Sequence, residues 1–176
     1  IYAYDEVQNV VSVVAPKVDV PATNVNPNRL PGGTYRIACY SNPKFGIDVE
    51  AISTADEANV HVWEYVGGKN QHFNVTFDTD HYNFQAVHSG KNIDLYKAGS
   101  AAGTNVMQYT PDGTAVQNWT LRDAGDGAYY IVNSNGLYLD AANGTMANGT
   151  NVQGWTGNES DAQKWLLIAV DGTRTL

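Results

Sequence analysis

The sequence predicts an all-β domain built from three similar units, and three observations support this prediction. The chain has 176 residues, of which 43% are hydrophobic and 16% charged, which is enough apolar content for one domain with a buried core. Seventeen Gly and eleven Tyr favour short strands joined by turns, and no helical periodicity runs along the chain. The third observation is an internal repeat with a period of 46 residues.

Six columns of residues recur at this period. They comprise Asp48, Asp94 and Asp140, then Asn59, Asn105 and Asn151, then Val60, Val106 and Val152, then Trp63, Tyr109 and Trp155, then Gln71, Gln117 and Gln163, and then Phe73, Trp119 and Trp165. Six columns in a single register exclude coincidence, so we expect the three units to share one local fold.

Each unit is predicted to hold four short strands bounded by turn residues. The first unit has them at 35–39, 46–49, 60–65 and 72–76, the second at 82–87, 93–96, 106–109 and 119–121, and the third at 129–133, 137–140, 152–155 and 165–168. A four-stranded unit cannot bury its own apolar face, so the three units must share one core, and a closed threefold arrangement also hides the strand edges. The prediction is therefore a β-trefoil over about residues 33–170, with repeats at about 33–79, 80–125 and 126–170.

Residues 1–32 and 171–176 lie outside the repeats and are expected to form an N-terminal segment and a C-terminal tail. The N-terminal segment is Val-rich over 7–20, which predicts a strand, and rich in Pro and Asn over 21–31, which predicts a linker. Two interpretations of the strand stay open, as the last strand of a preceding domain or as a strand on the side of the trefoil. Because the chain begins at Ile1 without Met or a signal-peptide pattern, we expect a processed chain or a piece of a longer protein.

Charge and apolar content argue against several classes of partner. A net charge of −8 repels the phosphates of nucleic acids and anionic membrane surfaces. No apolar run approaches the length of about 18 residues that membrane insertion needs. Cys39 is the only cysteine, so no internal disulfide is possible. No nucleophile, metal or phosphate-loop motif occurs, so we expect no enzyme activity, cofactor or metal.

Each unit carries a Gln-x-aromatic segment with an Asp 23 residues before the Gln. The segments are Gln71-His72-Phe73, Gln117-Asn118-Trp119 and Gln163-Lys164-Trp165, so Phe replaces Trp in the first. This pattern resembles the Q-x-W repeats of ricin B-chain type β-trefoil lectins and carbohydrate-binding modules, and the third unit is similar to modules of bacterial secreted glycoside hydrolases. The resemblance implies an extracellular, non-catalytic module that binds glycans, such as galactose-type sugars or plant and cell-surface polysaccharides, and is covalently linked to other domains.

The resemblance also implies a role for each position of up to three pockets. The Asp accepts hydrogen bonds from two sugar hydroxyls, an aromatic residue stacks on the sugar ring, an Asn donates a further bond and the Gln holds the Asp. The positions in this chain are Asp48, His61, Trp63, Asn70 and Gln71 in the first unit, Asp94, Tyr109 and Gln117 in the second, and Asp140, Gln153, Trp155 and Gln163 in the third. His61 is placed at the rim. Val116 and Ala162 stand where Asn is expected, which predicts affinity in the order first, third, second.

Elementary chemistry supports the same residue types. A sugar presents adjacent hydroxyls and one apolar ring face, so a site needs a fixed acceptor, an amide donor and an exposed aromatic plate. Asp48, Asn70 and Trp63 would supply these. Structural roles are the alternative, with the Asp residues capping turns and the aromatic residues packing in the core. At the level of function, the alternatives are a degenerate trefoil that serves as a spacer or a protein-binding surface, and an inhibitor or toxin-delivery trefoil.

Overall fold

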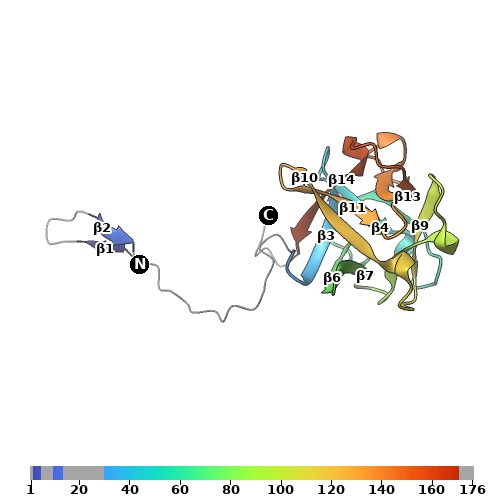
Figure 1. Ribbon diagram of the computed structural model, residues 1–176, viewed down its shortest axis with the longest axis horizontal. Helices are drawn as coiled ribbons and strands as arrows, with labels where there is room; N and C mark the ends of the chain where they lie inside the picture. The colour runs from blue at the N-terminus through green and yellow to red at the C-terminus, as the bar shows by residue number, and fades with distance from the viewer. Residues whose placement is uncertain (1, 5–9, 14–29, 171–176) are drawn as a thin grey trace. The chain divides into compact units, whose positions relative to one another are not determined.

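The computed structural model describes residues 2–4, 10–13 and 30–170, and the chain divides into two units, Ile1–Leu30 and Pro31–Leu176. In the first unit, β1 (Tyr2–Tyr4) pairs antiparallel with β2 (Val10–Val13), as Figure 1 shows. β2 lies inside the Val-rich stretch 7–20, and its partner is the short strand β1. Residues 21–29 of the predicted linker and the predicted tail lie outside the described residues.

Within residues 30–170 the second unit has twelve strands, four in each repeat, as predicted. The first repeat has β3 (Gly33–Cys39), β4 (Phe45–Val49), β5 (Val60–Glu64) and β6 (Phe73–Asp78). The second has β7 (His81–Ala86), β8 (Asn92–Leu95), β9 (Thr104–Tyr109) and β10 (Trp119–Gly125), and the third has β11 (Ala128–Asn133), β12 (Tyr138–Ala141), β13 (Thr150–Trp155) and β14 (Lys164–Ala169). β10 runs beyond the predicted 119–121 because it pairs with β11 along its whole length.

The strands form a closed barrel with three hairpins across one end. Around the barrel, β3 pairs with β6, β6 with β7, β7 with β10, β10 with β11, β11 with β14 and β14 with β3. The hairpins are β4–β5, β8–β9 and β12–β13, and they meet through pairings of β13 with β5 and with β9. This topology confirms the predicted β-trefoil, in which each repeat gives two strands to the barrel and one hairpin to the cap.

The aromatic residues of the Q-x-W column fill the barrel. Phe73, Trp119 and Trp165 are fully buried. The indole Nε1 of Trp119 donates to Ile93 O over 3.2 Å, and that of Trp165 donates to Leu139 O over 2.9 Å. A buried indole N–H needs such a partner, and each bond joins the barrel to the cap hairpin of its own repeat.

The Asn column joins the three hairpins to one another. Asn105 Nδ2 donates to Asn59 Oδ1 over 3.0 Å, and Asn151 Nδ2 donates to Asn105 Oδ1 over 2.8 Å. These side chains are half-buried where β5, β9 and β13 approach. Each amide therefore satisfies a polar group of a different repeat, which is the structural role that an amide column favours.

Candidate functional site

Each repeat holds its Asp at the second-to-last position of the first hairpin strand, one residue before a tight turn. Asp48, Asp94 and Asp140 are 5%, 4% and 4% exposed. The turns that follow are η1 (Glu50–Ile52), η3 (Tyr96–Ala98) and η5 (Ala142–Gly144). In every turn the last two residues have positive φ, so the chain doubles back and forms a wall beside the Asp. The fold thus produces three similar places around the cap.

The third repeat contains a pocket of about 680 Å³ with Asp140 in its lining. Asp140 Oδ1 accepts a hydrogen bond from Gln153 Nε2 over 3.0 Å, and Oδ2 accepts one from Gln163 Nε2 over 3.1 Å. Burial raises the pKa of the Asp140 carboxyl, and these two hydrogen bonds oppose the shift. Trp155 lines the same pocket and is 38% exposed, so this aromatic ring is at the surface and outside the core.

Two asparagines that line the third pocket carry amide donors, and the sequence does not identify them as site residues. Asn143 belongs to η5, and Asn158 follows β13. Among the described residues neither side-chain NH₂ group has a hydrogen-bond acceptor, although Asn158 Oδ1 accepts from the backbone of Ser160. Both fit the glycosylation pattern Asn-x-Ser/Thr, so the sequence indicates them as glycosylation acceptors and not as ligand-binding residues. Ala162, which stands where Asn was expected, lines the same pocket.

The second repeat contains a pocket of about 540 Å³ around Asp94. Gln117 Nε2 donates to Asp94 Oδ2 over 2.9 Å, whereas Met107 occupies the position of Gln153 and cannot donate to Oδ1. Burial raises the pKa of Asp94, and the negative charge of Asp112 adds to the increase. Tyr109 lines this pocket and is half-buried.

Glu57 is a further residue of the second pocket, and it comes from the first repeat. Its place in the lining arises from packing between repeats, so no motif within the second repeat predicts it. Ala115 and Val116 also line this pocket, which is more apolar than the third.

The first repeat differs from the roles that the resemblance implied. Asp48 Oδ1 lies 3.0 Å from His61 Nε2, and Asp48 Oδ2 accepts from Asn70 Nδ2 over 2.9 Å. The expectation that His61 lies at the rim is wrong, because the residue is 7% exposed and its ring stacks on Trp63 with a centroid distance of 5.1 Å. Trp63 itself is 38% exposed.

Asn70 has the role that was expected for Gln71, and the side chain of Gln71 bonds only to the backbone of Glu64 and Val66 among the described residues. Asn70 Nδ2 also donates to Val49 O over 3.1 Å, so both hydrogens of its NH₂ group bond within the protein. Gln71 Nε2 donates to Glu64 O over 2.9 Å and is not bonded to Asp48. In the first repeat Asn70 therefore holds the Asp, whereas Gln117 and Gln163 do so in the other two.

Other kinds of site lack support in the part of the chain that the structure describes. No three His, Cys, Asp or Glu residues there come together in a way that could hold a metal ion. No helix there has the length and apolar character needed to cross a membrane. Cys39 is fully buried, and burial raises the pKa of its thiol to about 12, so it is not a thiolate at neutral pH.

Comparison with known proteins places this arrangement in a family. The model of the family described as "Ricin-type beta-trefoil lectin domain-like" matches residues 24–109, 70–155 and 115–176. The crystal structure of ThreeFoil, a designed threefold-symmetric protein, is 36% identical, with a TM-score of 0.75 over 78% of this chain and 99% of ThreeFoil. A sequence comparison with curated proteins gave no match.

Two natural proteins show the same fold at lower identity. An exo-β-1,3-galactanase from Clostridium thermocellum is 25% identical, with a TM-score of 0.74, over 78% of this chain and 30% of the galactanase. The Macrolepiota procera ricin B-like lectin, solved in complex with lactose, is 20% identical, with a TM-score of 0.69, over 80% of this chain and 99% of the lectin. With three overlapping family matches on three structural repeats, the chain belongs to the family of ricin-type β-trefoil lectin-like domains.

Proposed function

We propose that this domain is a non-catalytic carbohydrate-binding module and that the pocket of the third repeat is its principal site for neutral sugars. The observation that carries the proposal is the combination, in one pocket of about 680 Å³, of the Asp140 carboxylate, the exposed ring of Trp155 and several amide groups. The family and the lectins among its structural neighbours support carbohydrate binding.

The geometry of the third pocket suits a pyranose ring. A carboxylate has about four lone-pair positions, so Asp140 can accept from sugar hydroxyls while it keeps its bonds from Gln153 and Gln163. These charge-assisted bonds are the stronger polar contacts of such a site. The Trp155 ring offers a flat apolar surface for the C–H face of the sugar, and Asn143 and Asn158 offer N–H donors.

We propose a different order of affinity from the one that the sequence predicts. The first repeat was expected to bind best because it alone has Asn at the donor position, but both hydrogens of the Asn70 amide are used by Asp48 and Val49. A sugar there would gain no donor from Asn70 without breaking a bond. We therefore place the third pocket ahead of the first.

The module is proposed to bind sugar without cleaving it. Glycoside hydrolysis needs two carboxyl groups that flank the scissile bond about 5 to 10 Å apart. The third pocket has one other acid, Asp161, and its Oδ1 lies 2.9 Å from Lys164 Nζ in an ion pair. Asp140 is thus left without a free acidic partner in that pocket.

We further propose that the module attaches a larger secreted or cell-surface protein to glycans. A trefoil of this kind spans 30% of the Clostridium galactanase, which supports a role as one part of a longer chain. The complex of the Macrolepiota lectin with lactose makes a galactose-type sugar the first ligand to test.

Calorimetric titration with lactose tests the proposal. Asp140→Ala should abolish measurable heat, and Trp155→Ala should weaken binding about tenfold or more, because it removes a stacking surface and its buried area. Asp123→Ala is the matched control, since Asp123 is an exposed carboxylate on β10 outside the third pocket. Equal binding by the parent and Asp140→Ala, with both folded by thermal unfolding, would refute the assignment of this pocket.

A further inference from the structure

We propose that the pocket of the second repeat binds a 2-amino-2-deoxyhexose residue with a free, protonated amine, and that Glu57 selects it. The inference rests on the proposed carbohydrate-binding function but assigns a different ligand to a different pocket. Its two supports are a buried carboxylate in the pocket, to which a single side chain donates among the described residues, and a carboxylate brought in from another repeat.

The first support is the state of Asp94. This residue is 4% exposed and lines the pocket, and Gln117 is the only side chain that donates to it among the described residues. In the third repeat the corresponding second oxygen accepts from Gln153, but Met107 takes that place here. The backbone of Leu95 also forms a hydrogen bond with the Asp94 carboxylate. A carboxylate has about four lone-pair positions, so Asp94 can still accept from a ligand, and an ammonium group is the donor that best stabilises a partly desolvated carboxylate.

The second support is the residue type at position 57. Glu57 has φ 64°, and the corresponding positions of the other two repeats are Gly103 and Gly149, with φ 90° and 85°. In all three repeats the backbone N–H at this position donates, over 2.9 Å, to a carbonyl in a hairpin strand of another repeat. The pairs are Glu57 with Gln108, Gly103 with Gly154 and Gly149 with Val62. Glycine suits this left-handed backbone better than Glu does. The first repeat thus carries a carboxylate at a position where its two counterparts have no side chain.

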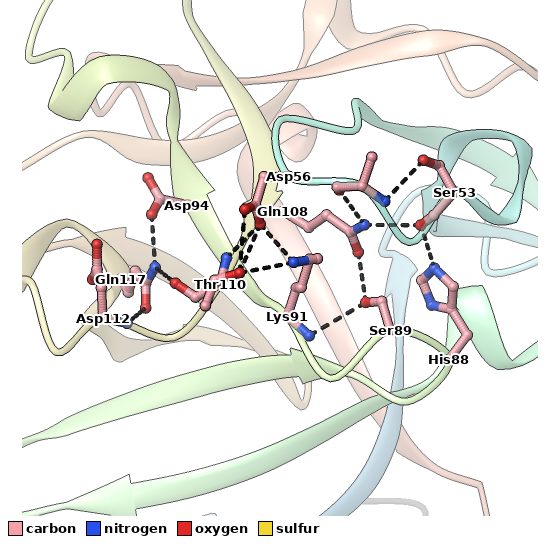
Figure 2. Close-up of polar contacts among 11 residues, drawn as sticks. Ser53, Asp56, His88, Ser89, Lys91, Asp94, Gln108, Thr110, Asp112 and Gln117 are labelled. Carbon is pink, nitrogen blue, oxygen red and sulfur yellow. Dashed lines mark hydrogen bonds and ion pairs between the residues drawn. The ribbon is translucent and has the colours of Figure 1, made fainter.

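Glu57 is held firmly against the second repeat by its neighbours in the loop. Figure 2 shows Asp56 beside Lys91 and Thr110, and Asp56 Oδ1 accepts from Lys91 Nζ over 2.6 Å and from Thr110 N over 2.8 Å. The buried amide of Gln108 donates to Ser53 O and to Ala55 O, each over 2.8 Å. These bonds anchor the loop, and Glu57 lines the pocket with a carboxylate that forms no bond to another described residue.

The charge of the second pocket also differs from that of the third. Its lining includes Glu57, Asp94 and Asp112 against the single cation Lys97, whose Nζ lies 5.1 Å from the Tyr96 ring centroid. Asp112 Oδ1 accepts from Thr114 N and Oγ1, and these bonds lower the pKa of Asp112 and keep it ionised. In the third pocket, by contrast, the second acid is neutralised by Lys164. An excess of negative charge favours a cationic ligand over a neutral one.

The ring part of the ligand follows from the other walls. Tyr109 occupies the column of Trp155, and Met107, Ala115 and Val116 supply apolar surface. A flat apolar wall beside a carboxylate fits a pyranose with an amine, whereas a lysine side chain would use the charge and leave the aromatic ring without a partner.

Nuclear magnetic resonance titration of the full ¹⁵N-labelled chain tests the inference. The probes are the methyl glycosides of glucosamine and galactosamine, their N-acetyl forms, and Nα-acetyl-lysine amide. The amino glycosides should shift the backbone amides of Lys97, Tyr109 and Thr114 and bind about twofold to fivefold more tightly than the N-acetyl forms, which is the range expected of solvent-accessible ion pairs. Glu57→Gln should remove most of that preference, and Asp112→Asn should reduce it by less.

Glycine substitution separates binding from folding. Glu57→Gly should raise the melting temperature and also lower affinity for the amino glycosides. Glu159→Gly is the matched control, because Glu159 likewise has a positive φ, 58°, and lies outside the second pocket. It should raise the melting temperature and leave affinity for the amino glycosides unchanged.

Several results would overturn the inference, and lactose binding at the third pocket in the same sample separates it from the proposed function. If lactose binds there while the amino glycosides bind no better than the N-acetyl forms, or while Nα-acetyl-lysine amide binds as well as they do, the inference fails alone. Unchanged preference in Glu57→Gln has the same meaning. If neither lactose nor the amino glycosides bind, the proposed function fails with it.

Discussion

Asn70 donates one hydrogen of its side-chain amide to Asp48 Oδ2 over 2.9 Å, within a site where both residues are nearly buried. A buried carboxylate loses its solvation by water, so its hydrogen-bond donors determine how costly that burial is. Asn70 therefore stabilises the buried Asp48 carboxylate. A change at Asn70 should alter the stability of the first repeat without altering sugar binding at the third pocket.

Asn70→Ala should therefore lower the free energy of unfolding by about 1 to 3 kcal/mol, since it removes a donor to a buried charged group. Urea denaturation measures this change. Lactose binding at the third pocket should be unaffected. Unchanged stability together with lost lactose binding would instead indicate that Asn70 acts as a sugar ligand.

The three tight turns beside the Asp residues should differ in strain. The third repeat has Asn143 and Gly144 at the two left-handed positions, the pair that such turns prefer, whereas the first repeat has Ala51 and Ile52 with φ 56° and 55°. The double change Ala51→Asn and Ile52→Gly should raise the free energy of unfolding by about 1 kcal/mol, because a left-handed L-residue costs roughly 1 to 2 kcal/mol.

The reverse change in the third repeat provides the comparison for this prediction. Asn143→Ala with Gly144→Ala should destabilise the domain by a similar amount. Thermal unfolding of both double variants checks the pair, and a loss of stability in the first variant would contradict the strain argument. Ile52 is 63% exposed, so the change there removes little packing.

Binding at the third pocket should weaken in acid at a higher pH than an ordinary Asp would cause. Burial raises the pKa of Asp140, and the protonated carboxyl loses the charge that strengthens its bonds to sugar hydroxyls. Lactose affinity measured between pH 4 and 7 should fall as the pH drops through this raised pKa. Asp140→Asn should bind weakly at every pH and show no such step.

The same shift predicts the sign of a stability effect. Since the pKa of Asp140 is higher in the folded than in the unfolded state, the folded state binds more protons between the two values. The contribution of this residue to stability is therefore greatest at low pH and declines as the pH rises through that window. Comparing the pH dependence of unfolding in the parent and in Asp140→Asn isolates this contribution.

Chelation and turnover assays test the absence of metal chemistry and catalysis. Lactose binding should be the same in EDTA as in its absence, and prolonged incubation with galactan should release no reducing ends. Loss of binding on chelation that calcium restores would contradict the first expectation, and time-dependent release that Asp140→Ala abolishes would contradict the second.

The repeats make the fold predictable because each column constrains all three units at once. The Q-x-W spacing predicts both the register and the burial of Trp119 and Trp165. The same spacing predicts the twelve strands of the three repeats. The strand ends are less predictable, since the length of β10 depends on its pairing with β11.

The pockets are less predictable because their chemistry depends on which amide faces which oxygen. Asn70 and Gln71 are adjacent amides in the turn η2 (Lys69–Gln71), and only the folded chain determines which of them reaches Asp48. Glu57 reaches the second pocket from another repeat, through contacts that no periodicity encodes.

The hydrogen bonds of the Asn column run in one direction, and this direction limits the threefold symmetry of the molecule. Asn151 donates to Asn105 and Asn105 donates to Asn59, but among the described residues no bond leads from Asn59 back to Asn151. Three identical side chains therefore occupy three different roles, as donor, relay and acceptor. The same residue at equivalent positions of the repeats does not make those positions equivalent. A substitution at Asn105 interrupts both hydrogen bonds and should therefore destabilise the contacts among all three repeats.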